Sequence, residues 1–267
     1  MRNAGNIWIQ GAGELASGVA VRLVRSGYRV LMADLPDPLA VRRLVCFCEA
    51  IHEGETRVED VPGVLLNPDG AVYLQGRVGV VVDPSGAVLG RVGAAAVVDA
   101  RMTKKPPAPL PRGDAPLIGL GPGFSCGLDA DLVVETHREA QLGALLAVGS
   151  AAKDTGEPGP VGGQTSLRLL RSPGAGSFNS LYDIGDVVEE GAVVGHVGGL
   201  PVVAGLSGMI RGLVHRRAEL SPGDKVGDVD PRGTEVDNRL VSDKALAVGG
   251  GVLEALLRLG VLPPQDR

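Results

Sequence analysis

The chain has 267 residues, a formal net charge of −5 and 41 glycines, which are about 15% of the sequence and roughly twice the usual share. Hydrophobic residues make up 44% and charged residues 21%, a balance that excludes global disorder. The glycines have no period of three, which excludes collagen. A mildly acidic chain has no general electrostatic reason to bind nucleic acid, so none is expected as a partner.

The sequence has few aromatic residues and few cysteines. With three Phe, three Tyr and one Trp, the core has to be built from Val, Leu, Ala and Ile at close backbone approach. Three cysteines fit a reducing compartment. The start has no signal-peptide pattern, and no apolar run reaches transmembrane length. We therefore expect a cytoplasmic protein without a membrane partner.

The first half of the chain alternates between strand and helix patterns. Apolar runs predict strands at residues 6–10, 29–33, 78–82, 95–99, 117–120 and 132–135. Helical spacing predicts helices at 14–26 and from Asp37, an N-cap followed by proline, to Gly54. Alternation of this kind indicates an α/β fold. We predict a Rossmann-like parallel sheet in a nucleotide-binding domain over residues 1–155.

The second half reads as a small β domain over residues 165–267, after a Gly- and Pro-rich linker at 153–164. The segment GAVVGHV, starting at Gly191, recurs as GDKVGDV, starting at Gly223. Two such halves related by a pseudo-twofold axis predict a biotinyl/lipoyl-like β-barrel. A final helix capped by Ser242 contains Gly249, Gly250 and Gly251, which lower helix stability and are explained best by a close packing contact.

A glycine motif follows the first predicted strand. Gly11, Gly13 and Ala16 match G-x-G-x-x-G/A at the start of a predicted helix, the context of a dinucleotide fingerprint. The helix start would attract a pyrophosphate, and Asp34, which ends the second strand, would bind a ribose. Glu14 and Gly18 belong to the same stretch. The alternative is a turn that packs in this way and holds no ligand.

Further candidates follow other predicted strands. Arg42 and Arg43 would contact a phosphate, such as the 2′-phosphate of NADP, or lie on a solvated helix face. Asp83 and Asp99 end Val-rich strands, where they would bind a ligand or cap a turn. Lys104 would add positive charge to the candidate site, or it would only contribute to the solubility of the protein. We expect Asp34, Asp99 and Lys104 to line one cleft with the glycine loop that contains Gly119, Gly121 and Gly123.

Three other kinds of site are disfavoured. Ser125 lies in a G-x-S-x-G match, but the segment after it reads as a strand, and a hydrolase elbow needs a helix. Cys46 and Cys48 point in different directions if they lie on a helix, and no zinc-type spacing occurs, so no metal is expected. No lysine lies between Lys153 and Lys225, so neither biotin nor lipoate should be attached.

Several long motifs point to one family. They are GAGELASGVAVRL, DPLAVRRLVCFCEAIHEGETRVEDV, VVDARMTKK, PLIGLGPGFSCGLDADLVVETHR and the tail GDVDPRG…VSDKALAVGGGVLEALL. In this order they resemble the YqeB-type accessory proteins of selenium-dependent molybdenum hydroxylases. The sequence departs from the family pattern, which has Glu at Asp34 and Ala or Ser at Cys46, Cys48 and Cys126. The cysteines therefore read as local variation rather than as a sulfur-transfer site.

The resemblance implies a role in maturing a molybdenum hydroxylase, alongside XdhC-type proteins that handle the molybdenum cofactor and also carry a Rossmann domain. An apo molybdenum hydroxylase and other maturation proteins would be the partners, and a homo-oligomer is compatible with the sequence. The ligand would be a molybdopterin dinucleotide or NAD(P). Two alternatives stay open: an NAD(P)-dependent oxidoreductase, for which no proton donor is visible, and a non-catalytic scaffold that docks the client enzyme. Whether the chain is an enzyme is undecided.

Overall fold

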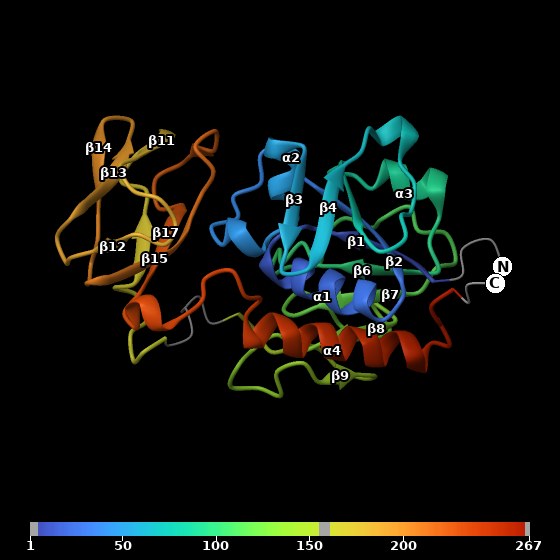
Figure 1. Ribbon diagram of the computed structural model, residues 1–267. Coiled ribbons are helices and arrows are strands. Elements are labelled where there is room, and N and C mark those ends of the chain that lie inside the picture. The colour runs from blue at the N-terminus through green and yellow to red at the C-terminus, as the bar shows by residue number, and fades with distance from the viewer. Residues whose placement is uncertain (1–4, 155–160, 265–267) are drawn as a thin grey trace. The chain divides into compact units, whose positions relative to one another are not determined.

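The computed structural model describes residues 5–154 and 161–264, which form two compact units (Figure 1). The first, called the sheet unit, contains Met1–Pro36, Val45–Thr155 and Val241–Arg267, and the second, called the β unit, contains Asp37–Leu44 and Gly156–Leu240. This division differs from the predicted ranges, because the last helix belongs to the sheet unit and a short early segment belongs to the β unit. Part of the predicted linker, residues 155–160, lies outside the described residues.

One mixed sheet of nine strands, in the order β3-β4-β5-β2-β1-β6-β7-β8-β9, is the frame of the sheet unit. The pairings from β4 through to β8 are parallel, whereas the edge strands β3 and β9 pair antiparallel. Its strands are β1 (Asn6–Gln10), β2 (Arg29–Asp34), β3 (Glu55–Val58), β4 (Val61–Leu65), β5 (Val78–Val82), β6 (Ala96–Asp99), β7 (Leu117–Leu120), β8 (Leu132–Val134) and β9 (Leu145–Leu146). The six strands predicted from the sequence in this half are confirmed, with ends that shift by at most one residue.

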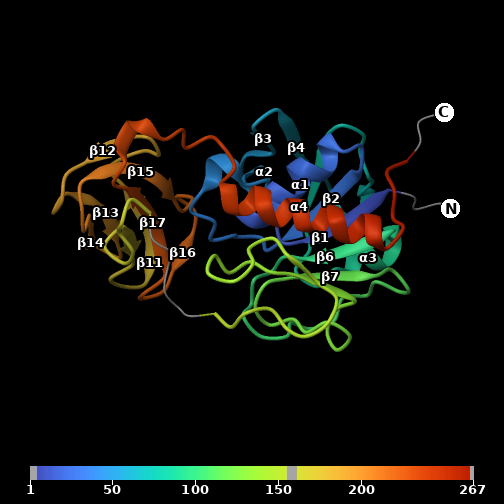
Figure 2. The same cartoon turned by 90° about the horizontal axis from the view of Figure 1, so that it is seen from below.

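Two long helices, α1 (Glu14–Arg25) and α4 (Asp243–Arg258), lie side by side against the sheet, as Figures 1 and 2 both show. Gly18 of α1 meets Ala245 of α4, and Gly249 meets Arg22 one turn further along both helices. The two helices therefore run parallel, and they begin at the same end. The predicted Ser242 cap is confirmed, because its side chain accepts a hydrogen bond from the Ala245 N–H.

The core of the sheet unit is aliphatic, as the composition predicts. On β1, Trp8 lies opposite Leu31 of β2 and Val97 of β6, and all three are fully buried. They pack with Val88 and other residues of α3 (Ala87–Val92) in one cluster. The remaining short helices of the described chain are α2 (Glu49–Glu53), η1 (Arg43–Val45), η2 (Pro68–Gly70) and η3 (Gly233–Glu235). No helix in residues 5–154 or 161–264 has the length and apolar character needed to cross a membrane.

The β unit consists of two curled antiparallel sheets, in the orders β10-β17-β15-β12 and β14-β13-β11-β16. Both sheets contribute to one core, which includes Phe178 and Val194 from one sheet and Ile210 and Val226 from the other. Its strands are β10 (Leu169–Arg171), β11 (Gly176–Ser180), β12 (Val187–Val188), β13 (Val193–Val197), β14 (Leu200–Val203), β15 (Gly208–Leu213), β16 (Glu219–Leu220) and β17 (Lys225–Asp230).

The 32-residue sequence repeat has a structural counterpart. The strands β10, β11, β12 and β13 recur, 31 or 32 residues later, as β14, β15, β16 and β17. The exchange of each strand for its counterpart converts the order of one sheet into the order of the other. Gly195 and Gly227, one from each copy, both lie where a Cβ atom would come within 2.7 Å of a carbonyl oxygen of the neighbouring strand.

The predicted fold class, a Rossmann-like parallel sheet followed by a biotinyl/lipoyl-like barrel with a terminal helix, is wrong. The large sheet is mixed, with antiparallel strands at both edges, and the strands of the second unit form two separate antiparallel sheets. The terminal helix belongs to the sheet unit, where it packs on α1. The antiparallel edges arise where the chain turns back, so that β3 pairs with β4 and β8 pairs with β9. The alternation of strand and helix patterns did not reveal these turns.

The helix predicted from Asp37 to Gly54 is also wrong over most of its length. Only its end is helical, as η1 and the five residues of α2, with Gly54 at φ +85° as the C-cap. The apolar residues of this stretch serve two cores: Val41 belongs to the core of the β unit, whereas Phe47 is buried in the sheet unit. One straight helix cannot supply both, so tertiary burial outweighs the local helix pattern.

Candidate functional site

The loops that follow the parallel strands meet at the carboxyl edge of the sheet, where ligands of open α/β sheets bind. Close contacts join these loops in pairs. The Ala12 N–H donates to Asp34, and a Cβ atom on Gly11 would lie 2.8 Å from the Ala100 oxygen. A Cβ atom on Gly123 would lie 2.8 Å from the backbone of Lys105, and one on Gly121 would overlap Thr136. We call this row of loops the strand-end edge.

The glycine loop, residues 11–13, is the centre of this edge. Gly11 has φ +106°, and the close Ala100 carbonyl leaves no room for a side chain. Asp34 accepts hydrogen bonds from the N–H groups of Ala12 at 2.6 Å and Leu35 at 2.8 Å. Burial raises the pKa of Asp34, and these two N–H groups oppose that rise. Asp34 therefore fixes the loop, and its remaining lone pairs are what a ribose would use.

Gly13 differs from its neighbours because it faces open space. No heavy atom lies within 4 Å of the position of an added Cβ atom. Gly13 is the N-cap of α1 and provides no side-chain cap, and the first N–H groups of a helix have no partner within the helix. Of the other predicted residues, Glu14 begins α1, Ala16 is buried, and Gly18 packs against Ala245 of α4.

Lys244, in the first turn of α4, is a residue that the sequence analysis missed. It is half-buried, and burial followed by the charge of Arg138 lowers its pKa, while Glu14, Glu135 and Asp154 raise it. No hydrogen bond or ion pair of Lys244 is found among residues 5–154 and 161–264. Because α1 and α4 start at the same end, this ammonium group lies near the start of α1. Only the pairing of two helices that are distant in sequence places it there.

Asp99 ends β6 and Lys104 lies in the loop after it, but the structure does not bring them to Asp34 as free groups. Asp99 is 1% exposed and is bound by the guanidinium of Arg101. Lys104 forms an ion pair with Asp154 at 2.8 Å on the surface. Met102 and Lys104 both have positive φ, which marks a tightly constrained loop.

The predicted glycines in and after β7 act mainly through packing. Gly119 leaves room for the ring of Phe124, 2.4 Å from where its Cβ atom would be. Gly121 and Gly123 have positive φ and let the loop touch its two neighbours. Ser125 is paired with Ser150, with 2.7 Å between the hydroxyl oxygens, and lies in no strand–turn–helix elbow.

Two further carboxylates at this edge cap backbone N–H groups. Asp83 accepts hydrogen bonds from the N–H groups of Ala87 and Val88 at the start of α3. Of the two roles expected for Asp83, it therefore has the role of capping a turn. Glu135, 4% exposed, accepts from the N–H groups of Thr136, His137 and Ala152, each at 2.7 Å. Glu135 thereby holds the chain near residue 152 against the end of β8. The sequence analysis did not single it out.

Arg42 and Arg43 belong to the β unit and are occupied there by carbonyl groups. Arg42 is 4% exposed and donates to the carbonyls of Asn238 and Leu240, and Arg43 donates to the carbonyl of Leu213. Arg42 and Arg43 therefore belong to a different unit from the glycine loop.

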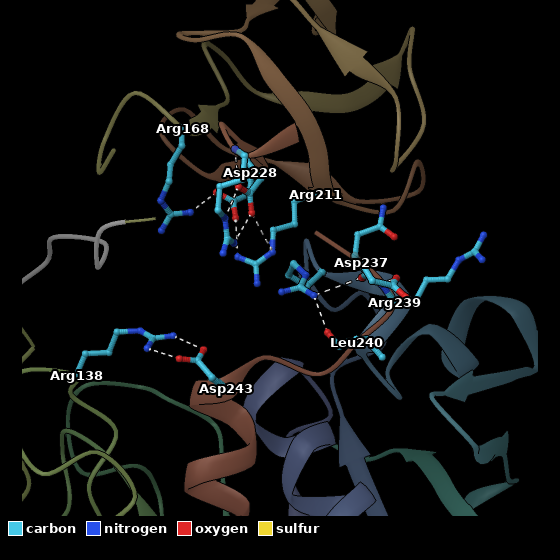
Figure 3. A network of polar contacts seen from close by, with 12 residues as sticks. Arg138, Arg168, Arg211, Asp228, Asp237, Arg239, Leu240 and Asp243 are labelled. Carbon is cyan, nitrogen blue, oxygen red and sulfur yellow. Dashed lines mark hydrogen bonds and ion pairs between the residues drawn. The ribbon is translucent and has the colours of Figure 1, made fainter. Parts of the chain in front are cut away.

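A separate group of charges is buried in the β unit (Figure 3). Asp228 and Asp230 of β17 are bound by Arg168, Arg211 and Arg232. Burial works to raise the pKa of Asp230, but the hydrogen bonds and charges of the arginines outweigh it and hold that pKa below its ordinary value. We interpret the β-unit group as structural, because each aspartate is paired.

Figure 3 also shows an ion pair of the sheet unit, between Arg138 and Asp243, the residue before Lys244. Its two N–O distances are 2.7 and 2.8 Å.

Comparison with solved structures gives only distant similarity. The match with a succinylglutamate desuccinylase/aspartoacylase of Rhodobacter sphaeroides covers 25% of this chain and 22% of that chain. Its sequence identity is 19% and its TM-score is 0.23. An aspartoacylase family protein of Mesorhizobium loti covers 84% of both chains, at 15% identity and a TM-score of 0.29. Scores this low carry no argument about the function of this chain.

Comparison of the sequence with known proteins is more informative. No family model matches the chain. A protein of Escherichia coli (strain K12) named "Uncharacterized protein YqeB" is 42% identical over 256 residues, which cover 94% of this chain and 47% of that protein. The chain thus spans about half the length of this relative. The extent of the identity supports its assignment to the YqeB family.

Proposed function

We propose that this chain is an accessory factor in the maturation of a molybdenum hydroxylase of the selenium-dependent class, and that it binds a nucleotide-type ligand such as a molybdopterin dinucleotide. Its partners would be the apo-hydroxylase and other maturation proteins, including XdhC-like ones, in the cytoplasm. The resemblance of the sequence motifs to YqeB-type accessory proteins supports this role, and the identity to a YqeB protein supports the family on which the resemblance depends. The ligand class rests on the strand-end edge.

The observation that carries the ligand class is the open, uncapped start of α1 at Gly13, beside the half-buried Lys244. Backbone N–H groups at a helix start favour an anion, and an ammonium group with no bound carboxylate adds to that preference. A pyrophosphate fits both. With few aromatic residues in the chain, we expect backbone and ammonium contacts to phosphate rather than stacking on a base.

The variant Gly13→Asp tests this ligand site. The new carboxylate would fit the open space, cap α1 and repel a phosphate, so folding stability should be unchanged or slightly higher. We expect CDP or CTP at 100 times its Kd to stabilise the wild type by about 2.7 kcal/mol. That shift in Tm should be absent from Gly13→Asp. NADH and NADPH are measured alongside.

Gly13→Asn is the matched control, because it has the same size, also caps the helix and has no charge. It should keep part of the shift. Undiminished nucleotide binding by Gly13→Asp would show that the glycine loop is not the site. A wild-type protein that is stabilised by NADPH but not by CDP or CTP would support the NAD(P)-dependent oxidoreductase instead.

The variant Lys244→Met tests the second part of the site. Burial lowers the pKa of Lys244, so the unfolded chain binds this proton more tightly and the ammonium form destabilises the fold. Unfolding midpoints at pH 7 should therefore rise in Lys244→Met, and the wild type should gain stability as the pH rises toward the ordinary lysine pKa. Binding of CDP should weaken. The exposed Lys153, changed to Met, should alter neither property.

A further inference from the structure

Strand β9, labelled in Figure 1, is an edge of the large sheet and pairs only with β8 among the described residues. Leu145 of β9 is opposite Val134. Next to this pair, the Glu135 N–H donates to the Ala144 carbonyl. In an antiparallel ladder, this pattern points the N–H and carbonyl groups of Leu145 away from β8, and the alternation along the strand does the same for Ala147. The outer side of β9 therefore offers backbone hydrogen-bonding groups to a further strand.

This edge has no charged residue, in contrast to the opposite edge of the same sheet. No Asp, Glu, Lys or Arg occurs in residues 140–152, which include β9. On β3, the strand at the other end of the sheet, Glu55 and Arg57 are exposed. Charged side chains on an edge strand are a common protection against pairing with another chain. The sheet therefore has this protection at β3 and lacks it at β9.

Two apolar side chains near β9 are exposed to water. Leu128 and Val148 are the most exposed large apolar residues of the described chain, at 86% and 83%. Val148 lies two residues after β9, and Leu128 lies in a turn whose Cys126 N–H donates to the Gly149 carbonyl at 2.8 Å. Single exposed apolar residues are ordinary on protein surfaces. Two of them beside an uncharged open edge form a surface that fits another apolar edge.

We propose that β9 pairs antiparallel with the β9 of a second copy of this chain, so that two large sheets join across a two-fold axis. A two-fold axis perpendicular to a sheet relates antiparallel strands, so this edge can serve as its own partner. A charged residue near that axis would face its own copy, and like charges opposite each other are destabilising. The uncharged segment of residues 140–152 has no such repulsion, whereas it offers no charge by which to select a charged partner.

Analytical ultracentrifugation of the full chain tests this pairing, and we expect the wild type to dimerise. Val148→Lys should raise the Kd of the dimer at least about ten-fold, because it places a lysine on the edge of both copies. Since Val148 is mostly exposed, the unfolding midpoint should stay the same. Val72→Lys is the matched control. Val72 is also exposed but lies in the loop before β5, so its replacement should leave the Kd unchanged.

Hydrogen exchange tests where the two copies meet. In the wild-type dimer, the amides of Leu145 and Ala147 should exchange at least several-fold more slowly than in Val148→Lys, while those of β3 stay unchanged. A wild type that is monomeric up to about 100 μM, or a Val148→Lys variant with the wild-type Kd, would overturn the proposal. A dimer in which these two amides are not protected would also overturn it, because the interface would then lie elsewhere. None of these results depends on the binding of CDP or CTP.

Discussion

Replacement of Glu135 by alanine should lower the free energy of unfolding of the sheet unit by about 3–5 kcal/mol. Its carboxylate accepts hydrogen bonds from three backbone N–H groups, those of Thr136, His137 and Ala152. Glu135 is almost fully buried, so alanine would leave these donors without an acceptor, and each buried orphan costs about 1–3 kcal/mol. Water that enters the vacated space would recover part of this cost.

Urea unfolding followed by circular dichroism measures this loss, and Glu139→Ala is the matched control. Glu139 lies four residues later in the same loop but is exposed, so its replacement should change stability by less than about 0.5 kcal/mol. Equal midpoints for the two variants would mean that Glu135 does not hold the chain near Ala152. Glu135→Gln should fall in between, because its amide keeps one acceptor oxygen.

The three consecutive glycines of α4 should respond to alanine in opposite directions. A Cβ atom on Gly251 would lie 2.2 Å from the carbonyl oxygen of Gly143 and 2.8 Å from Val134. Neither the carbonyl nor the strand can move freely, so Gly251→Ala should destabilise the sheet unit by about 2 kcal/mol. Gly249→Ala should cost less, because part of its clash is with the flexible side chain of Arg22.

Gly250→Ala is the internal control for this set. Apart from the neighbouring backbone of α4 itself, no atom lies within 4 Å of its added Cβ atom, so only helix propensity changes, and stability should rise by about 0.5–1 kcal/mol. The three variants are compared by their urea midpoints. Destabilisation by Gly250→Ala, or tolerance of Gly251→Ala, would contradict the packing of α4 against the loop of Gly143. The predicted packing role of the triple glycine thus holds for Gly249 and Gly251 only.

Local sequence patterns predicted a strand or a helix end correctly where residues within one short segment determine it. The alternation of apolar residues marked the six strands of the first half, and the Ser242 cap marked the start of α4. Gly11 was assigned to the glycine motif after the first strand, and its φ of +106° is one that glycine adopts readily. In these cases backbone geometry and side-chain type are tied within a few residues, so the sequence contains the whole signal.

The candidate site was predicted only in part. The glycine loop and Asp34 do lie together, because a strand, a turn and the next parallel strand are close in sequence. Arg42 and Arg43 were assigned to the same site but lie in the β unit. Lys244 and Glu135 were missed, because nothing near them in sequence shows that they meet α1 and the strand ends.

The sequence by itself therefore determined six strands of the first half, the helices α1 and α4, the 32-residue repeat and the glycine loop. Only the tertiary structure decided that the large sheet has antiparallel edges and that α4 joins α1. The physical reason is the separation in sequence over which each kind of interaction acts. Periodicity and capping act within a turn or a strand, whereas strand pairing, helix contact and the partners of buried polar groups depend on which distant surfaces fit together.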